Sequence, residues 1–461
     1  MLSIAKPGRI LARAAVALLV SLALILGWGP QALAASNRIS LIRDAEIEAT
    51  IRSYAAPLLG VAGIDVNAVK VHLVNDDRLN AFVAGGMNLF INTGLLQSSE
   101  TPNEVIGVIA HEIGHIEGGH LIRRQEALEN ATAESILATV LGAVVIAAGG
   151  GGAGAVVIQG GQEAAMRGLL RYSQGQESSA DHAGLRYLDA THQSARGLLA
   201  LLRKLESQEL LTSARQSPYL RTHPLSRERL LTVEHHVSIS PYADVVDPPE
   251  RIEAQARMAA KLIGFINQPS SVLRTYPETD ESLPARYARA IAYHRSADLP
   301  RALSEIDGLI AERPNDPYFH ELKGQILFEQ GRLAESVGPY QRSVELAPNE
   351  PLLRLGLGRA LIEAGDAASL ASAVEHLRAA ANAEPTYASH WHFLGVALGR
   401  KGDLAESSLA FAERSLLNAQ YSEATFHAEK ASAGLTTGSP QWLRAQDILN
   451  AARNQREADK Q

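Results

Sequence analysis

The sequence predicts an α+β domain, mostly helical with a small sheet, followed by an all-α solenoid of tetratricopeptide repeats. A helical pattern over residues 101–120 contains the run His111-Glu112-Ile113-Gly114-His115. Upstream of it, apolar and polar residues alternate as in a half-buried strand. Beyond residue 285, glycines and prolines recur with a period near 34 residues. That period is typical of the helix pairs of tetratricopeptide repeats.

Composition limits the chemistry that the chain can perform. Its 461 residues are 46% hydrophobic, which suits two or three domains with their own cores. There is no cysteine, so disulfides and thiolate metal sites are excluded, and any metal must be bound by histidine and carboxylate. The formal net charge of −7 makes nucleic acid an improbable partner.

Residues 1–34 have the pattern of a secretory signal peptide. Three basic residues precede an apolar run over 14–28, and Ala32-Leu33-Ala34 supplies an A-x-A cleavage site. An uncleaved N-terminal anchor is the alternative, because the apolar run is long. Removal of this segment lowers the net charge from −7 to −10. We therefore expect a bacterial periplasmic protein.

The helix over 101–120 carries the candidate chemistry. His111 and His115 are four residues apart, so they share a helix face and can bind a single Zn²⁺. Glu112 is rotated by about 100° from His111, and it can take a proton from a water whose pKa the zinc has lowered to about 7. This is the zincin motif H-E-x-x-H. His120 should face the opposite side of the helix, as a structural or surface histidine.

A buried helix with two hydrogen-bonded histidines is the alternative, but a plain core helix would not bury these polar groups without partners. We expect the helix to begin with Thr101 as N-cap, Pro102 in the first position and Glu104 completing a capping box.

The preceding residues predict a helix and a small sheet. Residues 40–59 have helical periodicity, and residues 69–74 alternate as a strand. Residues 80–92 should form two short strands around Gly85-Gly86. The run Asn80-Ala81-Phe82 could pair with an extended substrate backbone, although an ordinary structural hairpin is an equal alternative.

The segment 135–158 carries no charge and is long enough to span a bilayer. Four consecutive glycines at 149–152 argue against one continuous helix. Two short apolar helices or an apolar loop fit better. Such a segment could contact a membrane peripherally, a hydrophobic substrate or the protein's own core.

Two further motifs could complete a metal site. Glu177 and Asp181 share a helix face, so that one could bind zinc while the other accepts the N–H of a zinc-bound imidazole. Such a pair alone is usually a solvated helix face. His223 precedes a proline and is therefore extended or in a turn. It could reach over the site, although an ordinary loop histidine is the simpler interpretation.

The rest of the chain is predicted to be helical. Residues 236–284 read as a connecting helix and linker, with a break at Pro248-Pro249 and a helix over 250–265. Residues 285–455 read as the repeat domain, and the last unit, from about 423, should cap the stack. Its markers are glycine pairs seven residues apart and a closing proline: Gly324 and Gly331, Gly358 and Gly365, Gly395 and Gly402, with Pro314, Pro348 and Pro385. The first unit has Ala290 and Ala297 at the glycine positions.

These motifs together resemble the gluzincin family of zinc metalloproteases, which includes the CaaX-type membrane endopeptidases. The resemblance rests on Asn80-Ala81-Phe82 with Gly85-Gly86, on Thr93-Gly94-Leu95-Leu96, on the H-E-x-x-H run and on Glu177-x-x-x-Asp181. The signal peptide, Thr222-His223-Pro224 and the repeats make the chain similar to periplasmic members of that family. It implies a zincin-like metalloprotease domain over 37–235.

The resemblance also implies roles for the site residues. His111, His115 and Glu177 would bind one Zn²⁺ per chain, Glu112 would be the general base and Asp181 would support a ligand. His223 would occupy the fourth metal position as a latency switch; as an alternative, it could be an oxyanion donor. The similarity to the periplasmic members implies action on misassembled outer-membrane proteins, with repeats that contact substrate or the assembly machinery. The apolar, glycine-rich segment 135–158 and the absence of cysteine depart from the periplasmic pattern.

The expected function is therefore a zinc-dependent endopeptidase of the cell envelope, located in the periplasm, with membrane attachment through 135–158 as an open alternative. One rival is a membrane-embedded endopeptidase. Another is a chaperone or scaffold that acts through its repeats, with a structural or latent zinc site. Glu112 favours the enzyme, because a structural zinc site has no need of it.

Overall fold

The computed structural model describes residues 40–120, 173–209 and 223–458, together with residues 123, 132, 159 and 219. The expected signal peptide over 1–34 and the apolar segment 135–158 lie outside these residues. Among the described residues, no helix combines the length and the apolar character that crossing a bilayer requires.

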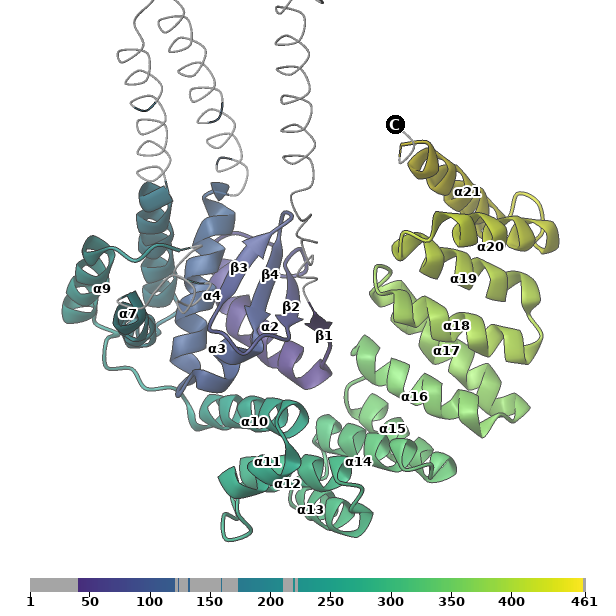
Figure 1. Cartoon of the computed structure of the whole chain (residues 1–461), viewed down its shortest axis with the longest axis horizontal. Coiled ribbons are helices and arrows are strands. Elements are labelled where there is room, and N and C mark those ends of the chain that lie inside the picture. Colours follow the sequence, from purple (N-terminus) through teal and green to yellow (C-terminus); the bar gives the residue numbers. More distant parts are fainter. Residues whose placement is uncertain are drawn as a thin grey trace, which may run out of the picture. The chain divides into compact units, whose positions relative to one another are not determined.

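Four short strands form one sheet in the first part of the chain (Figure 1), in the order β1-β2-β4-β3. β2 and β4 run parallel, and the two outer pairs are antiparallel. The predicted hairpin is present, and Gly85 and Gly86 take positive φ angles of 54° and 94° in its turn, which glycine adopts readily. The strands are β1 (Leu41–Ile42), β2 (Lys70–Val74), β3 (Ala81–Ala84) and β4 (Asn88–Asn92).

The helix expected over 40–59 begins later than predicted. Asp44 is its N-cap and accepts a hydrogen bond from the Ile47 N–H, so the helix cannot extend to earlier residues. Leu41 and Ile42 form β1 instead, paired with β2. The sequence pattern missed this strand because two residues are too few to show alternation.

One apolar core joins the sheet to the surrounding helices. The H-E-x-x-H helix, α4, has Thr101 as N-cap, but the predicted capping box is wrong because Thr101 makes no side-chain cap hydrogen bond. Glu104 instead accepts a hydrogen bond from Lys204 at 2.8 Å. The helices are α2 (Ala45–Val61), α3 (Thr93–Ser98), α4 (Pro102–Glu117), a helix over 173–190, α7 (Arg196–Glu209) and α9 (Arg227–Ile239).

The remainder is helical, as predicted, and its antiparallel pairs follow one another in Figure 1. The expected linker also contains a short helix, α11, that its proline-rich sequence concealed. The helices are α10 (Pro249–Ile266), α11 (Pro269–Thr275), α12 (Leu283–Arg295), α13 (Leu299–Glu312), α14 (Pro317–Glu329), α15 (Leu333–Leu346), α16 (Pro351–Ala364), α17 (Ala367–Ala383), α18 (Ala388–Lys401), α19 (Leu404–Leu417), α20 (Tyr421–Gly434) and α21 (Pro440–Ala458).

The repeat glycines have two structural roles. A Cβ atom at Gly358 would lie 2.5 Å from the Leu377 side chain, so this glycine lets two helices cross closely. The second glycine of each pair, like Gly365 with a φ of 78°, ends a helix in the left-handed region. Ala297 occupies that place in the first unit and has a φ of 58°.

Polar contacts join the start of α2 to the repeats. The Tyr287 hydroxyl donates to Glu46 at 2.7 Å, and both groups are buried. Arg43 donates to Glu384 at 2.9 Å, across 341 residues of sequence. Lys261 Nζ of α10 lies 2.8 Å from Asp44 Oδ2. The first part of the chain and the repeat part therefore share a charged junction.

Candidate metal centre

α4 directs polar side chains into the protein interior. His111 and Glu112 are fully buried, and His115 is 7% exposed. The Nε2 atoms of His111 and His115 lie 3.1 Å apart. Both rings therefore point to one place, as their four-residue spacing predicts.

The helix over 173–190 crosses α4 at very short range. A Cβ atom at Gly114 would lie 2.7 Å from the Ala180 carbonyl oxygen, and one at Gly184 would lie 3.1 Å from the Ala110 carbonyl carbon. A larger residue at Gly114 would push the helices apart. This close crossing brings Glu177 and Asp181 to the histidines of α4, so the predicted carboxylate pair is buried and not solvated.

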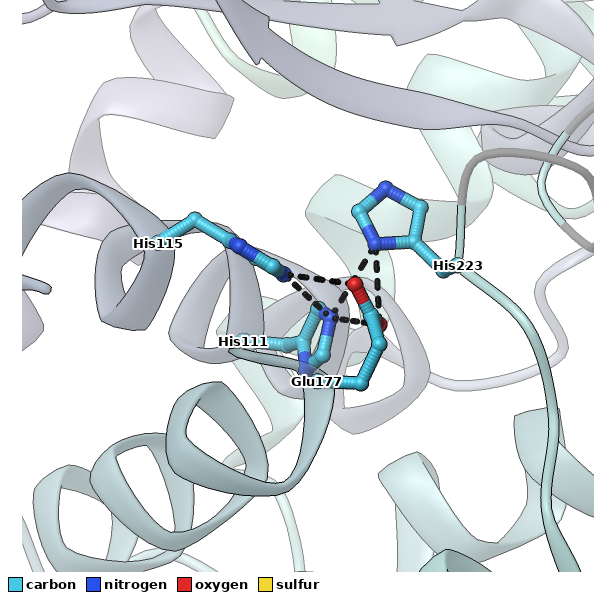
Figure 2. A group of neighbouring side chains, drawn as sticks. All are labelled: His111, His115, Glu177 and His223. Carbon is cyan, nitrogen blue, oxygen red and sulfur yellow. Dashed lines mark hydrogen bonds and ion pairs between the residues drawn. The ribbon is translucent and has the colours of Figure 1, made fainter. Parts of the chain in front are cut away.

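Glu177 faces both α4 histidines (Figure 2). Its Oε2 atom lies 3.3 Å from His111 Nε2, and its Oε1 atom lies 3.4 Å from His115 Nε2. The carboxylate is 3% exposed. Two imidazole nitrogens and one carboxylate therefore converge from two helices.

Asp181 supports His111 from the other side of its ring. His111 Nδ1 lies 2.8 Å from Asp181 Oδ1. With the Nδ1 proton directed at a carboxylate, the Nε2 lone pair faces Glu177 and His115. Arg229 donates two hydrogen bonds to Asp181, at 2.6 and 2.9 Å.

Arg229 was not predicted from the sequence. It lies on α9 and is 3% exposed, and its Nη1 atom is 3.0 Å from Glu177 Oε2. Two buried carboxylates call for a cationic partner. That requirement is the only signal in the sequence, and it does not single out one arginine.

The electrostatics of the cluster keep its carboxylates ionised. Burial would raise the pKa of Asp181, but the charge of Arg229 lowers it to about 2. The pKa of Glu177 is held well below its ordinary value, against burial, by His223 and by hydrogen bonds from His111 and His115. Burial would lower the pKa of His111, but Asp181 and Glu177 raise it to about 9.

His223 covers the remaining side of the cluster (Figure 2). Its Nδ1 atom lies 3.1 Å from Glu177 Oε2, and its Nε2 atom lies 3.4 Å from Glu112 Oε1. The ring stacks on the buried Tyr219, with centroids 4.5 Å apart, and the His223 N–H donates to the Tyr219 carbonyl oxygen at 2.7 Å. Tyr219 was also missed, because its role depends on the fold around it.

Glu112 differs from the other carboxylates. Both of its oxygens are buried, and neither has a hydrogen-bond partner among the described residues. A buried carboxylate without hydrogen bonds is costly, and such groups are concentrated at functional sites. Glu112 is therefore placed to act on a molecule that enters the site.

The prediction that His120 faces away from the site is wrong. α4 ends at Glu117, and Gly119, with a φ of 59°, interrupts the regular helix before His120. His120 is 5% exposed, and its Nδ1 atom lies 3.0 Å from His115 Nδ1. The prediction from the nine-residue spacing failed because it assumed a helix that is continuous from His111 to His120.

The donor set fits a metal ion. One ligand atom from each of His111, His115, Glu177 and His223 lies within 4.8 Å of the others, and all four residues are buried. The buried carboxylates of the site outnumber its one buried arginine by two, and a divalent cation would balance that charge. Nitrogen and carboxylate donors in this number suit zinc.

The proposed edge strand lies next to this helix. β3 packs against α4 and pairs only with β4 among the described strands, so its other edge is unpaired. Asn80, just before β3, is 6% exposed, and its Oδ1 atom has no hydrogen-bond partner among the described residues. Phe82 stacks on Phe90 of β4, with centroids 4.9 Å apart.

The mixed fold and the buried H-E-x-x-H cluster define a metalloprotease. Residues 42–237 match the model of Peptidase family M48, and residues 287–351 match that of the Tetratricopeptide repeat. The chain is accordingly a metalloprotease with an M48 peptidase domain followed by tetratricopeptide repeats.

Named relatives agree with this assignment. A Beta-barrel assembly-enhancing protease of Yersinia pestis is 25% identical over 80% of this chain and 75% of its own length. One from Escherichia coli (strain K12) is 24% identical over 70% of this chain and 67% of its own. Among solved structures, YrrB, a TPR protein with an unusual peptide-binding site, is 19% identical over 38% of this chain and 91% of its own, with a TM-score of 0.32.

Proposed function

We propose that this metalloprotease is a zinc-dependent endopeptidase of the cell envelope that degrades, or helps to assemble, misfolded outer-membrane proteins. The observation that carries the proposal is the buried cluster of His111, His115 and Glu177 beside Glu112, whose oxygens accept no hydrogen bond from the residues that the structure describes. Relatives named β-barrel assembly-enhancing protease support the substrate class.

In this proposal His111, His115 and Glu177 hold one zinc per chain. Bound zinc would polarise the scissile carbonyl and make water more acidic. Glu112 acts as the general base, taking a proton from the attacking water and passing it to the leaving amine. Asp181 keeps His111 in the tautomer that presents Nε2, and Arg229 keeps Asp181 ionised.

The unpaired edge of β3 is the proposed substrate track. An extended peptide added beside Ala81 and Phe82 would gain main-chain hydrogen bonds with little demand on its sequence. Asn80 lies just before that strand, and its buried Oδ1 atom has no hydrogen-bond partner in the described part of the chain. A protease that degrades many different misfolded chains needs to accept peptides of varied sequence.

His223 is the proposed latency switch. Its ring lies between Glu177 and Glu112, where it would compete with the water that Glu112 must activate. The oxyanion-donor alternative requires the ring to leave the metal side and remain beside the substrate carbonyl. Removal of the ring separates the two roles, because a latency switch restrains activity whereas an oxyanion donor supports it.

The proposed location is the periplasm, reached through the signal peptide over 1–34, with peripheral membrane contact through 135–158. The repeats would recruit unfolded substrates or the outer-membrane assembly machinery. Attachment is tested by asking whether the exported protein is released from membranes by high salt, by detergent, or without treatment.

The direct test is cleavage of an unfolded protein by the zinc-loaded chain without residues 1–34. Glu112→Gln should bind zinc and lose roughly 10²–10⁴-fold in rate, whereas Glu100→Gln, an exposed carboxylate, should keep full activity. His223→Ala should cleave faster if the histidine is a latency switch, and slower if it is an oxyanion donor. Zinc binding without cleavage by the wild type or by His223→Ala would instead favour a scaffold that acts through the repeats.

A further inference from the structure

The turn that ends α4 places a fourth imidazole, that of His120, behind His115 and outside the four-residue cluster. His120 is 5% exposed, and its ring meets the His115 ring edge-to-face, with centroids 4.9 Å apart. The two Nδ1 atoms are 3.0 Å apart. His120 thus contacts the face of His115 that points away from the cluster.

Neighbouring residues fix the position of the His120 ring. A Cβ atom at Gly118 would lie 2.3 Å from His120 Nε2, so the ring fits only against glycine. The positive φ of Gly119 interrupts the helix just before His120. Gln176, next to Glu177, donates a hydrogen bond to the His120 carbonyl oxygen at 3.2 Å. The turn is therefore tied to the helix that supplies the carboxylate of the cluster.

The position of the His115 proton determines which of the two histidines donates the hydrogen bond. His115 Nε2 faces His111 Nε2 and Glu177, so it is the atom that offers a lone pair to a metal. The neutral ring then carries its proton on Nδ1, which must donate. The partner in front of it is His120 Nδ1, and the structure gives His115 Nδ1 no second hydrogen-bond partner among the residues it describes. His120 Nδ1 therefore accepts, and His120 carries its own proton on Nε2.

We propose that His120 is a positioning residue, which fixes the tautomer and orientation of His115 for metal binding. This inference rests on the zinc site of the proposed function. The two ligand histidines of α4 are then supported differently. His111 donates to the carboxylate of Asp181, whereas His115 donates to an imidazole without formal charge.

The first test compares two substitutions by competition for zinc with a chelator. His120→Leu removes the acceptor and should weaken zinc binding by about 10- to 100-fold, the usual effect of losing such a partner. His120→Asn places its Oδ1 atom where Nδ1 lies now and should recover most of that loss. Equal weakening by Leu and Asn, or zinc binding by His120→Leu within about twofold of wild type, would overturn the proposal.

A second variant leaves His120 in place. Gly118→Ala puts a methyl group into the ring position and should displace the imidazole, with a loss of zinc affinity similar to that of His120→Leu. Gly175→Ala is the matched control, since a Cβ atom there meets nothing within 4 Å and Gly175 is two residues from Glu177. If His120→Leu does not fold, the two glycine variants decide the question, and unchanged zinc affinity in Gly118→Ala counts against the proposal.

Zinc affinity, rather than cleavage, separates this inference from the proposed function. A wild-type chain that binds no zinc would overturn the proposed metal site itself. A wild-type chain that binds zinc, beside a His120→Leu variant that binds it equally well, would overturn the role of His120 alone. Thermal unfolding of the metal-free variants checks that His120→Leu and His120→Asn are comparably folded.

Discussion

Replacement of Arg229 by methionine tests the electrostatic account of the site most severely. Arg229 is 3% exposed and holds Asp181 through two hydrogen bonds, with a further ion pair of 3.0 Å to Glu177. Methionine keeps much of the side-chain volume and removes the charge. In the metal-free protein, two buried carboxylates would then have only histidines as charged partners.

The size of the effect follows from that burial. Removing one partner from a buried ion pair destabilises a protein by about 3–5 kcal/mol. For a domain of this size, about 1 kcal/mol shifts the Tm by roughly 2–4 °C, so the metal-free Tm of Arg229→Met should fall by about 10 °C. Zinc should restore part of the loss, because a cation would neutralise Glu177.

The assay is thermal unfolding of wild type and Arg229→Met, each with and without zinc. Arg186→Met is the matched control. Arg186 makes an exposed ion pair of 3.4 Å with Glu117, and such pairs contribute at most about 1 kcal/mol. Its Tm should therefore change by a few degrees or less.

A double variant could refute the reasoning. If the damage in Arg229→Met comes from an unpaired buried charge, adding Asp181→Asn should recover stability in the metal-free protein. A double variant whose loss equals the sum of the single losses would show that the arginine acts through packing alone. A Tm of Arg229→Met within about 2 °C of wild type would also reject the argument.

Three further predictions concern packing, pH and backbone strain. Gly197→Ala should destabilise the protein by about 1–3 kcal/mol, since its Cβ would lie 2.3 Å from the Asn103 carbonyl carbon. Burial would raise the pKa of Glu384, but His390 and Arg43 lower it to about 2. The ionised Glu384 carboxylate therefore contributes its full stabilisation above its ordinary pKa, and this stabilisation is lost as the pH falls towards 2. Glu384→Gln should therefore lower the Tm at pH 7 and leave it nearly unchanged at pH 2. Ala297→Gly should raise stability by about 0.5–1 kcal/mol, because glycine relieves a φ of 58°.

Each of these has its own control in the same Tm assay. Gly60→Ala meets no atom within 4 Å and should be neutral or stabilising. Glu363→Gln removes an exposed carboxylate, paired with Arg400, and should show a small effect at every pH. Ala371→Gly, inside α17, should destabilise by about 0.5–1 kcal/mol. If Ala297→Gly and Ala371→Gly changed the stability in the same direction, the strain argument would be contradicted.

The sequence predicted those parts of the molecule whose signals are local. Alternation over 69–74 and the glycines of the hairpin predicted β2, β3 and β4, and the 34-residue period predicted the helix pairs of the repeats. Four-residue spacing along helices predicted that His111 shares a face with His115 and that Glu177 shares a face with Asp181. In each case the physical cause, a helical or strand period, acts within a few residues.

What the sequence could not predict depends on tertiary contacts or on where an element ends. Arg229 joins the cluster because α9 packs beside the helix over 173–190, and no pattern near residue 229 encodes that. His120 was misplaced because one positive φ at Gly119 outweighs an otherwise helical pattern. The Glu104 carboxylate is not available for a capping box because it accepts a hydrogen bond from Lys204, which is distant in sequence.

The charged junction at the start of α2 has a consequence for the order in which the molecule matures. Glu46 and Asp44 are synthesised long before their partners Tyr287 and Lys261, and Arg43 bonds to a residue 341 positions later. Until these later partners exist, the first turn of α2 lacks its final contacts. Ribosomal synthesis therefore delivers the catalytic half first, and its last stabilising contacts arrive with the part that is proposed to recruit its substrates.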